Sequence, residues 1–234
     1  HAKERKLVFL SSPFSIEAAN LLNEIGLKMW KVASGEFYNT PLIEFLVKTK
    51  KPILLSTGMS SWKEIDEKVK FLKKYSQPSL IFQCTSQYPT PSKEIGINLI
   101  QEMKKRYKIP IGFSDHSGQL SSGIAAYVSG ARALEVHVTL SKNIYNFDLD
   151  SSLSMNELSE LTNGIRFLEG ALNNPLDKDF IARKMKKMKS NFTSSVMFKN
   201  DMKKGSIIKF SDLSFKKPGS GIPAEKYKLL IGKK

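Results

Sequence analysis

The amino-acid sequence predicts an α/β fold, a (β/α)8 TIM barrel followed by a small β-rich domain. Short β-rich runs alternate with helical patterns in units of about 20–30 residues, which favours a parallel sheet with helical crossovers. Each run ends in polar or small residues. Polar groups at the carboxyl ends of successive parallel strands are typical of a barrel, whereas a doubly wound sheet gathers them at one switch point. After Leu168 the pattern changes to shorter pieces, which predicts the second domain.

The barrel is expected to occupy residues 1–172 and to be partial. Its six strand-like runs are Leu7–Leu10, Met29–Ala33, Pro52–Ser56, Leu80–Cys84, Ile109–Phe113 and Ala133–Val138. A complete barrel of this type has eight strands. Because His1–Lys6 is typical of the end of a helix, we expect the first two strand–helix units to be absent from this sequence, which leaves strands 3–8.

Two capping boxes mark the starts of predicted helices. Ser61 is followed three residues later by Glu64, and Ser154 is followed in the same way by Glu157. Each pair precedes apolar residues at helical spacing. These apolar residues are Ile65, Val69 and Leu72 after the first box, and Leu158, Leu161, Ile165 and Leu168 after the second.

The chain beyond the barrel predicts a linker and a small domain. Asn173-Asn174-Pro175 breaks the preceding helix, and we expect a basic linker over residues 173–190. The small domain is expected over residues 191–234 and to be truncated after Ile231-Gly232-Lys233-Lys234. Its strand-like pieces are Ser195–Phe198, Ile207–Ile208 and Leu213–Lys216.

Composition narrows the class of protein. A hydrophobic share of 41% in 234 residues allows a buried core. The single cysteine excludes an intramolecular disulfide and favours a reducing compartment. Since no stretch approaches the roughly 20 apolar residues of a spanning helix, we expect no membrane partner and a cytoplasmic location. The net charge of +15 comes from scattered lysines without a nucleic-acid-binding motif, so we expect solvated surface and no nucleic-acid partner.

Two internal histidines, each at the end of a strand-like run, are candidate metal ligands. His116 follows Ile111–Asp115, and His137 lies in the run Leu134–Thr139. In the second run the strand pleat places Glu135, His137 and Thr139 on one face and the apolar residues on the other. The sequence lacks the HExxH and cysteine-rich spacings of strong metal motifs, so a structural role for both imidazoles stays open. On ligand preference alone, two imidazoles suit Zn²⁺ or Fe²⁺ better than Mn²⁺ or Mg²⁺.

Other strand ends carry groups that could bind an anionic sugar substrate. Lys31 supplies a cation and Glu36 an acceptor for hydroxyls, with a barrel-interior ion pair as the alternative. Ser56 and Thr57 offer hydroxyls for an anion, or form an ordinary strand-to-helix turn.

Two loops add further candidates. Tyr88 lies in the rigid loop Tyr88-Pro89-Thr90-Pro91 and either faces a ligand or only shapes a turn. Asp148 lies in a long loop after the last predicted strand, a common place for catalytic groups.

Taken in order, these motifs resemble the bacterial N-acetylneuraminate (sialic acid) synthase family, and the tail resembles its C-terminal antifreeze-like domain. The motifs are Ser11-Ser12-Pro13-Phe14-Ser15, Trp30-Lys31-Val32-Ala33-Ser34-Gly35-Glu36, Leu55-Ser56-Thr57-Gly58-Met59, Gln83 to Pro91, Gly112-Phe113-Ser114-Asp115-His116-Ser117 and Leu134-Glu135-Val136-His137-Val138-Thr139. In the tail they are Lys203-Lys204-Gly205 and Lys217-Pro218-Gly219-Ser220-Gly221.

The resemblance implies an enzyme, a transferase of surface polysaccharide biosynthesis. Such enzymes condense phosphoenolpyruvate with the open-chain aldehyde of an N-acetylated mannosamine-type sugar, release phosphate and yield a nine-carbon 2-keto acid. The resemblance also implies a bound Mn²⁺ or Mg²⁺ ion and a domain-swapped homodimer, in which the small domain of one chain covers the barrel mouth of its partner.

The resemblance assigns roles to individual residues. His116 and His137 would hold the metal. The phosphoenolpyruvate contacts would be Lys31, Ser56 and Ser114, the sugar contacts Glu36, Tyr88 and Asp148, and the catalytic groups Asp148, Glu36 and Lys31. Thr57 would be a further substrate-binding residue. Lys217 stands where the family usually has arginine, so it keeps the charge of a substrate contact and loses the two-pronged geometry.

Three departures from the family pattern leave other functions open. The family's first two strands supply a glutamate and a lysine that this sequence lacks, Lys217 replaces arginine, and Asn146-Phe147-Asp148 replaces the usual Gly-Pro-Asp. One alternative is another phosphoenolpyruvate-dependent aldol-type barrel synthase. A second alternative is a sugar-binding protein without catalysis, if the native chain lacks the first two strands.

Overall fold

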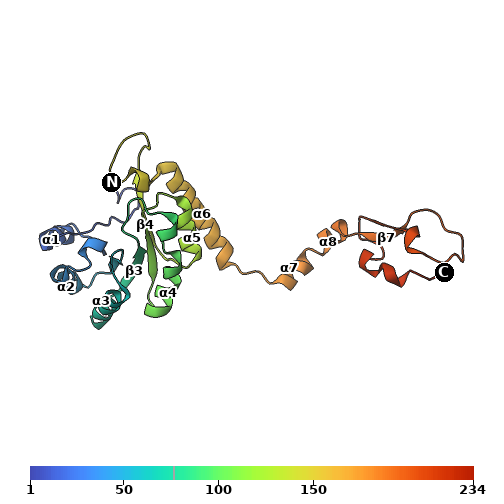
Figure 1. Cartoon of the computed structure of the whole chain (residues 1–234), viewed down its shortest axis with the longest axis horizontal. Coiled ribbons are helices and arrows are strands. Elements are labelled where there is room, and N and C mark those ends of the chain that lie inside the picture. Colours follow the sequence, from blue (N-terminus) through green and yellow to red (C-terminus); the bar gives the residue numbers. More distant parts are fainter. Residues whose placement is uncertain (76) are drawn as a thin grey trace. The chain divides into compact units, whose positions relative to one another are not determined.

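The computed structural model describes residues 1–75 and 77–234 and divides them into two compact units, His1–Gly170 and Ala171–Lys234. Figure 1 shows the elements of both units coloured along the chain. The first unit holds the large sheet with its helices, and the second holds two short helices and a hairpin.

The first unit is built on a parallel sheet whose six strands follow one another in chain order and curl into a half-barrel. The strands are β1 (Trp30–Val32), β2 (Ile53–Ser56), β3 (Ser79–Cys84), β4 (Ile111–Asp115), β5 (Leu134–Thr139) and β6 (Ser152–Ser154). Ser56 lies opposite Phe82, and Cys84 lies opposite Ser114. Because all strands run in one direction, their polar carboxyl ends meet along one rim.

The prediction of a strand at Leu7–Leu10 is wrong. This segment is irregular, and its side chains Leu7, Val8 and Phe9 are exposed. An apolar run becomes a strand only beside a partner that takes up its hydrogen bonds. Within the described residues, β1 pairs with β2 alone, so Leu7–Leu10 has no such partner.

The sixth strand lies instead at β6, which the sequence pattern did not indicate. Ser152–Ser154 is short and mostly polar, so it carries no strand periodicity of its own. It joins the sheet through β5, with His137 opposite Ser152. Pairing with a neighbour, rather than local sequence, creates this strand.

Helices alternate with the strands of the first unit. They are α1 (Ile16–Glu24), α2 (Thr40–Lys48), α3 (Trp62–Lys74), α4 (Ile97–Tyr107), α5 (Leu120–Val128) and α6 (Met155–Asn173). In Figure 1, α4, α5 and α6 lie along one side of the sheet. The buried core contains large side chains from both strands and helices, among them Trp30, Ile81, Phe113, Leu46 and Ile100.

Both predicted capping boxes are confirmed. At the start of α3, Ser61 N donates to Glu64 Oε2 at 2.7 Å and Glu64 N donates to Ser61 Oγ at 3.5 Å. At the start of α6, Ser154 and Glu157 exchange the same pair of bonds, at 2.7 and 3.3 Å. These bonds satisfy backbone donors that a helix start leaves without partners.

A polar cluster joins α3 to α4 on the surface. Arg106 Nε donates to Asp66 Oδ1 at 2.8 Å, and the hydroxyl of Tyr107 donates to the same oxygen at 3.0 Å. The Arg106 hydrogen bond, assisted by Tyr107, lowers the pKa of Asp66. These contacts hold two successive crossover helices side by side.

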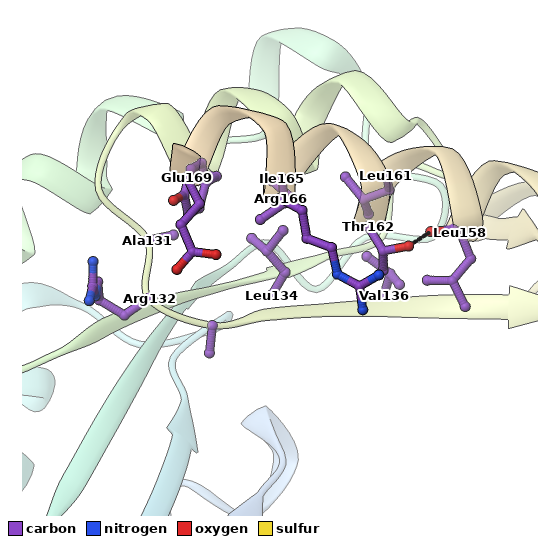
Figure 2. Close-up of a pocket in the computed structure, with 12 residues that line it drawn as sticks. Ala131, Arg132, Leu134, Val136, Leu158, Leu161, Thr162, Ile165, Arg166 and Glu169 are labelled. Carbon is purple, nitrogen blue, oxygen red and sulfur yellow. Dashed lines mark hydrogen bonds between the residues drawn. The ribbon is translucent and has the colours of Figure 1, made fainter. Parts of the chain in front are cut away.

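The outer face of β5 borders a groove. Residues 140–151 join β5 to β6 and contain only a short 3-10 turn at Leu149–Ser151. The described chain therefore has no α-helix between these two strands, and α6 is the next helix after α5. The groove has a volume of about 420 Å³, and Figure 2 shows Leu134 and Val136 facing Leu161 and Ile165 of α6. These apolar contacts belong to the face of β5 that points away from Glu135 and His137.

The second unit contains α7 (Lys178–Lys184), α8 (Lys186–Phe192), β7 (Ser195–Phe198) and β8 (Leu213–Lys216). The two strands pair in antiparallel fashion, with Ser195 opposite Lys216. The predictions of strands at these two positions are confirmed, and the one at Ile207–Ile208 is wrong. Ile208 exchanges backbone bonds with Gly232 and Lys233 without forming a strand.

Residues 173–190, predicted as a linker, include α7 and most of α8. Among the described residues, no helix is both long and apolar enough to span a bilayer.

Candidate active site

A cavity of about 310 Å³ lies at the carboxyl ends of the strands of the first unit. It brings together six residues predicted for the site, which are Lys31, Ser56, Tyr88, Ser114, His116 and His137. The remaining lining residues are Ala33, Ser34, Gly35, Met59, Cys84, Ser86 and Glu135. The strands β1 to β5 each contribute at least one side chain, which is the arrangement that a barrel rim imposes.

Lys31 places a buried cation in this cavity. The residue is only 6% exposed, and its Nζ donates to Ser56 Oγ at 2.8 Å. The ammonium also stands 5.4 Å from the centre of the Phe82 ring. A lysine held by a hydroxyl and an aromatic face can receive the anionic groups of a small substrate.

Glu135 completes this arrangement, and sequence reasoning did not assign it a role. Its Oε1 lies 3.3 Å from Lys31 Nζ and accepts a hydrogen bond from Ser114 Oγ at 2.9 Å. The strand alternation that pointed to His137 also places Glu135 on the cavity face. That alternation was the signal by which the residue could have been found.

The contacts of His116 determine which of its nitrogens would coordinate a metal ion. His116 Nδ1 lies 2.8 Å from the carbonyl oxygen of Thr85, and because a carbonyl only accepts, Nδ1 carries the hydrogen. In the neutral imidazole Nε2 then holds the lone pair, and the hydroxyl of Tyr88 donates to it at 2.9 Å. Burial, followed by the nearby charges of Cys84, Asp148 and Glu135, raises the pKa of Tyr88, so the phenol keeps its proton.

His137 stands beside His116 and is oriented by Asp148. The centres of the two imidazole rings are 5.3 Å apart. His137 Nδ1 lies 3.3 Å from Asp148 Oδ2. A carboxylate beside one ring nitrogen favours a proton there and leaves the other nitrogen as the coordinating atom. Asp148, predicted as a sugar contact and catalytic group, is thus placed to orient a candidate metal ligand.

These imidazoles fit a divalent metal ion that takes its other ligands from water or substrate. Each histidine has one nitrogen engaged by an acceptor, which is the usual arrangement around a metal-binding histidine. In residues 1–75 and 77–234, no group of three or more His, Cys, Asp or Glu side chains is gathered for a metal. A site with two protein ligands leaves several coordination positions for oxygen atoms of a substrate.

Cys84 contributes a neutral thiol to the cavity. Ser34 Oγ donates to Cys84 Sγ at 3.7 Å and accepts from Gly58 N at 3.1 Å. Burial raises the pKa of Cys84. This effect outweighs the hydrogen bonds with Ser34, Ser114 and Ser86, which lower it. An added Cβ at Gly58 would lie 2.2 Å from Ser86 Oγ and 2.9 Å from Cys84 Sγ, so any other residue here would displace these side chains. The turn after β2 therefore approaches the end of β3 closely.

Glu36 and Thr57 lie near the cavity but outside its lining. Glu36 accepts a hydrogen bond from Asn39 Nδ2 at 2.7 Å, at the start of α2. Thr57 is buried, and its hydroxyl donates to the carbonyl of Phe82 at 2.9 Å. In this structure the Thr57 hydroxyl joins β2 to β3.

Lys217 belongs to the second unit, where it follows β8. Its side chain is exposed, and Nζ lies 5.4 Å from the centre of the Phe192 ring of α8.

A family model described as the NeuB family matches residues 1–176 of this chain. An N,N'-diacetyllegionaminic acid synthase from Campylobacter jejuni is 37% identical over the whole chain, which spans 70% of that protein. A pseudaminic acid synthase from the same species is 31% identical, again over the whole chain and 67% of the relative.

Among solved structures, a sialic acid synthetase from Leptospira borgpetersenii, crystallised with citrate, matches with a TM-score of 0.74 and 28% identity. The match covers 82% of this chain and 67% of that one.

Proposed function

Because this chain belongs to the NeuB family and is an enzyme of the synthase type, we propose that it condenses phosphoenolpyruvate with an N-acetylated mannosamine-type sugar to form a sialic-acid-like nonulosonate. The observation that carries this proposal is the cavity itself. It combines a buried lysine among hydroxyls with two neighbouring imidazoles, each held at Nδ1 by an oxygen acceptor. The first group suits an anion, and the second suits a metal ion that would polarise an aldehyde.

In this proposal, Lys31, Ser56 and Ser114 bind the anionic groups of phosphoenolpyruvate. The ammonium supplies positive charge, and the two hydroxyls supply donors from neighbouring strands. Phosphoenolpyruvate is a weak carbon nucleophile, so holding its C3 against the aldehyde carbon would supply a large part of the acceleration.

His116 and His137 are the proposed ligands of a Mn²⁺ or Mg²⁺ ion. When bound, such an ion supplies Lewis-acid polarisation of the sugar aldehyde. The contacts of Thr85 and Asp148 with Nδ1 of the two rings support this role. Tyr88 has a hydroxyl that could also reach the sugar, and Glu36 is proposed as an acceptor for sugar hydroxyls.

The proposed condensation has three steps. C3 of the enol forms a bond to the aldehyde carbon, whose oxygen takes a proton, and C2 becomes cationic. Water adds to C2 and gives up a proton. The C2–O bond to phosphate then breaks while the C2 hydroxyl passes its proton to the departing phosphate, which leaves the 2-keto group and inorganic phosphate. Anionic groups around C2 are suited to stabilise this cationic centre before water adds.

We also propose the assembly that the family resemblance implies, a domain-swapped homodimer whose small domain covers the partner's cavity. Lys217 would then approach a substrate acyl group or carboxylate as a single point charge, without the fork of an arginine.

A phosphate-release assay tests this function. The whole protein is mixed with Mn²⁺, phosphoenolpyruvate and either N-acetylmannosamine or its 6-deoxy, di-N-acetylated relatives. We expect phosphate release that depends on one of these sugars. Release with an aldose phosphate instead would show an aldol-type synthase of shorter sugars, and no release with any sugar would contradict the proposal.

The metal ligands are tested separately. His116→Ala and His137→Ala should each abolish both turnover and Mn²⁺ binding, measured by electron paramagnetic resonance. Unchanged Mn²⁺ binding in either variant would remove that residue from the metal site.

A further inference from the structure

One carboxylate oxygen lies where two groups of the anion site converge. Glu135 Oε1 is 2.9 Å from Ser114 Oγ and 3.3 Å from Lys31 Nζ. Lys31 in turn is bonded to Ser56. Two of the three groups assigned to phosphoenolpyruvate, Lys31 and Ser114, are therefore already directed at one oxygen of the protein itself. An anionic substrate that uses these donors must share them with Glu135 or displace it.

The two partners of this ion pair differ in exposure, which decides which one can move. The side chain of Lys31 is 8% exposed, whereas that of Glu135 is 39% exposed. Moving a buried ammonium away from its counter-charge is costly, while a half-exposed carboxylate can turn toward solvent at less cost. Ser56 and the Phe82 ring also keep Lys31 in place. An arriving anion would therefore displace Glu135 and leave Lys31 where it is.

We propose that Glu135 is a positioning residue that competes with the substrate anion for Lys31 and Ser114, and so weakens the binding of inorganic phosphate. This inference rests on the proposed function, in which inorganic phosphate is a product. A substrate with both a phosphate and a carboxylate gains enough contacts to displace Glu135. Inorganic phosphate gains fewer, so the returning carboxylate helps to expel it.

The substitution Glu135→Gln tests this competition in the whole protein. The amide keeps the shape of the side chain and an oxygen that accepts from Ser114, but it removes the charge that attracts Lys31. We expect inorganic phosphate to bind roughly three- to thirty-fold more tightly in isothermal titration, since the lost ion pair is partly screened by solvent.

Steady-state kinetics distinguish this competition from a purely structural role of Glu135. In Glu135→Gln, KM for phosphoenolpyruvate should fall together with kcat, and inhibition by added phosphate should strengthen. A residue that only supports folding would instead raise KM or lower the melting temperature.

Two further variants test whether the effect comes from the pair formed by Lys31 and Glu135. Glu94→Gln removes an exposed carboxylate of the same unit that pairs with Lys93, and it should leave phosphate affinity within about two-fold of the wild type. In a Lys31→Gln background, Glu135→Gln should no longer tighten phosphate binding, because the partner for which Glu135 competes is gone.

The outcomes decide between the inference and the function on which it rests. Unchanged or weaker phosphate binding in correctly folded Glu135→Gln, judged by circular dichroism, would overturn the inference. Loss of Mn²⁺ binding in that variant would also overturn it, because Glu135 would then act on the metal. If the wild type releases no phosphate from phosphoenolpyruvate with any sugar, the proposed function fails, while the titrations still measure the competition.

Discussion

Single atoms decide what the cavity can bind. The Thr85 carbonyl engages His116 Nδ1, so the lone pair on Nε2 is the one that faces Tyr88. A metal ion that used His116 would compete with the Tyr88 hydroxyl for that lone pair. The same hydroxyl is a candidate sugar contact, so metal binding at His116 would release it toward the substrate.

We expect Tyr88→Phe to bind Mn²⁺ roughly two- to ten-fold more tightly than the wild type. The variant loses one hydrogen bond that competes with the metal, and such bonds contribute about 0.5–1.5 kcal/mol. Electron paramagnetic resonance of free Mn²⁺ measures the change. Tyr38→Phe is the control, because the Tyr38 hydroxyl donates to the carbonyl of Met59 and not to a histidine. Weaker or equal binding in Tyr88→Phe would contradict the competition.

The single thiol of the chain gives a prediction about pH. Burial raises the pKa of Cys84, so the thiolate becomes appreciable only above the ordinary range of a cysteine. Iodoacetamide should therefore modify native Cys84 slowly at neutral pH and faster as the pH rises above the pKa of an ordinary cysteine. Mass spectrometry follows the reaction, with the unfolded chain as the reference. Rapid modification of the folded protein at pH 7 would refute the raised pKa.

At the scale of elements, strand ends and the turns that follow them position the site. β4 carries Ser114 and leads directly into His116, and β5 carries both Glu135 and His137. The turn after β4 lies against the β5–β6 connection at Gly118. Gly118 has a φ of +66°, and an added Cβ would lie 2.3 Å from the backbone oxygen of Asp150.

Gly118→Ala should therefore destabilise the protein by about 1–3 kcal/mol and weaken Mn²⁺ binding. The strain comes from the left-handed backbone and from the clash with Asp150. That clash would shift the loop that holds Asp148 beside His137.

Gly26→Ala provides the comparison for this prediction. Gly26 also has a positive φ, +84°, but no atom lies within 4 Å of its added Cβ. Urea unfolding and Mn²⁺ titration measure both variants. Equal effects of the two substitutions would show that the contact with Asp150 does not matter.

The sequence predicted those features whose structure depends on residues close together along the chain. The capping boxes at Ser61 and Ser154 and the alternation in β5 depend on neighbours along the chain, and all three are confirmed. Leu7–Leu10 and β6 depend on which strand is available for pairing, and local pattern holds no such information. Glu135 was missed for a related reason, because its role depends on contacts with Lys31 and Ser114 from other strands.

At the scale of the whole molecule, the chain consists of two units that meet within α6, at Gly170 and Ala171. The cavity lies wholly in the first unit, and Lys217 lies in the second. The family match likewise covers residues 1–176, which is the first unit and a few residues more. The half-barrel therefore carries the site described here.

Limited proteolysis should cut first between residues 171 and 178. This segment is exposed, and residues 174–177 lie between the ends of α6 and α7 without regular structure. Mass spectrometry of the earliest products should show a fragment close to the first unit. First cuts inside β1–β6 would show that the half-barrel opens more readily than the segment after α6.

The two faces of β5 have a consequence for insertions and deletions. Residues of β5 alternate between two sides of the strand. Leu134 and Val136 line the outer groove, whereas Glu135 and His137 line the cavity. Adding or removing one residue within β5 would exchange these faces, sending apolar side chains into the cavity and the glutamate and histidine outward. Residues 140–148 carry no such alternation, and the exposed Phe147 lies among them. Insertions and deletions that alter sugar preference should therefore occur in residues 140–148 and not in β5.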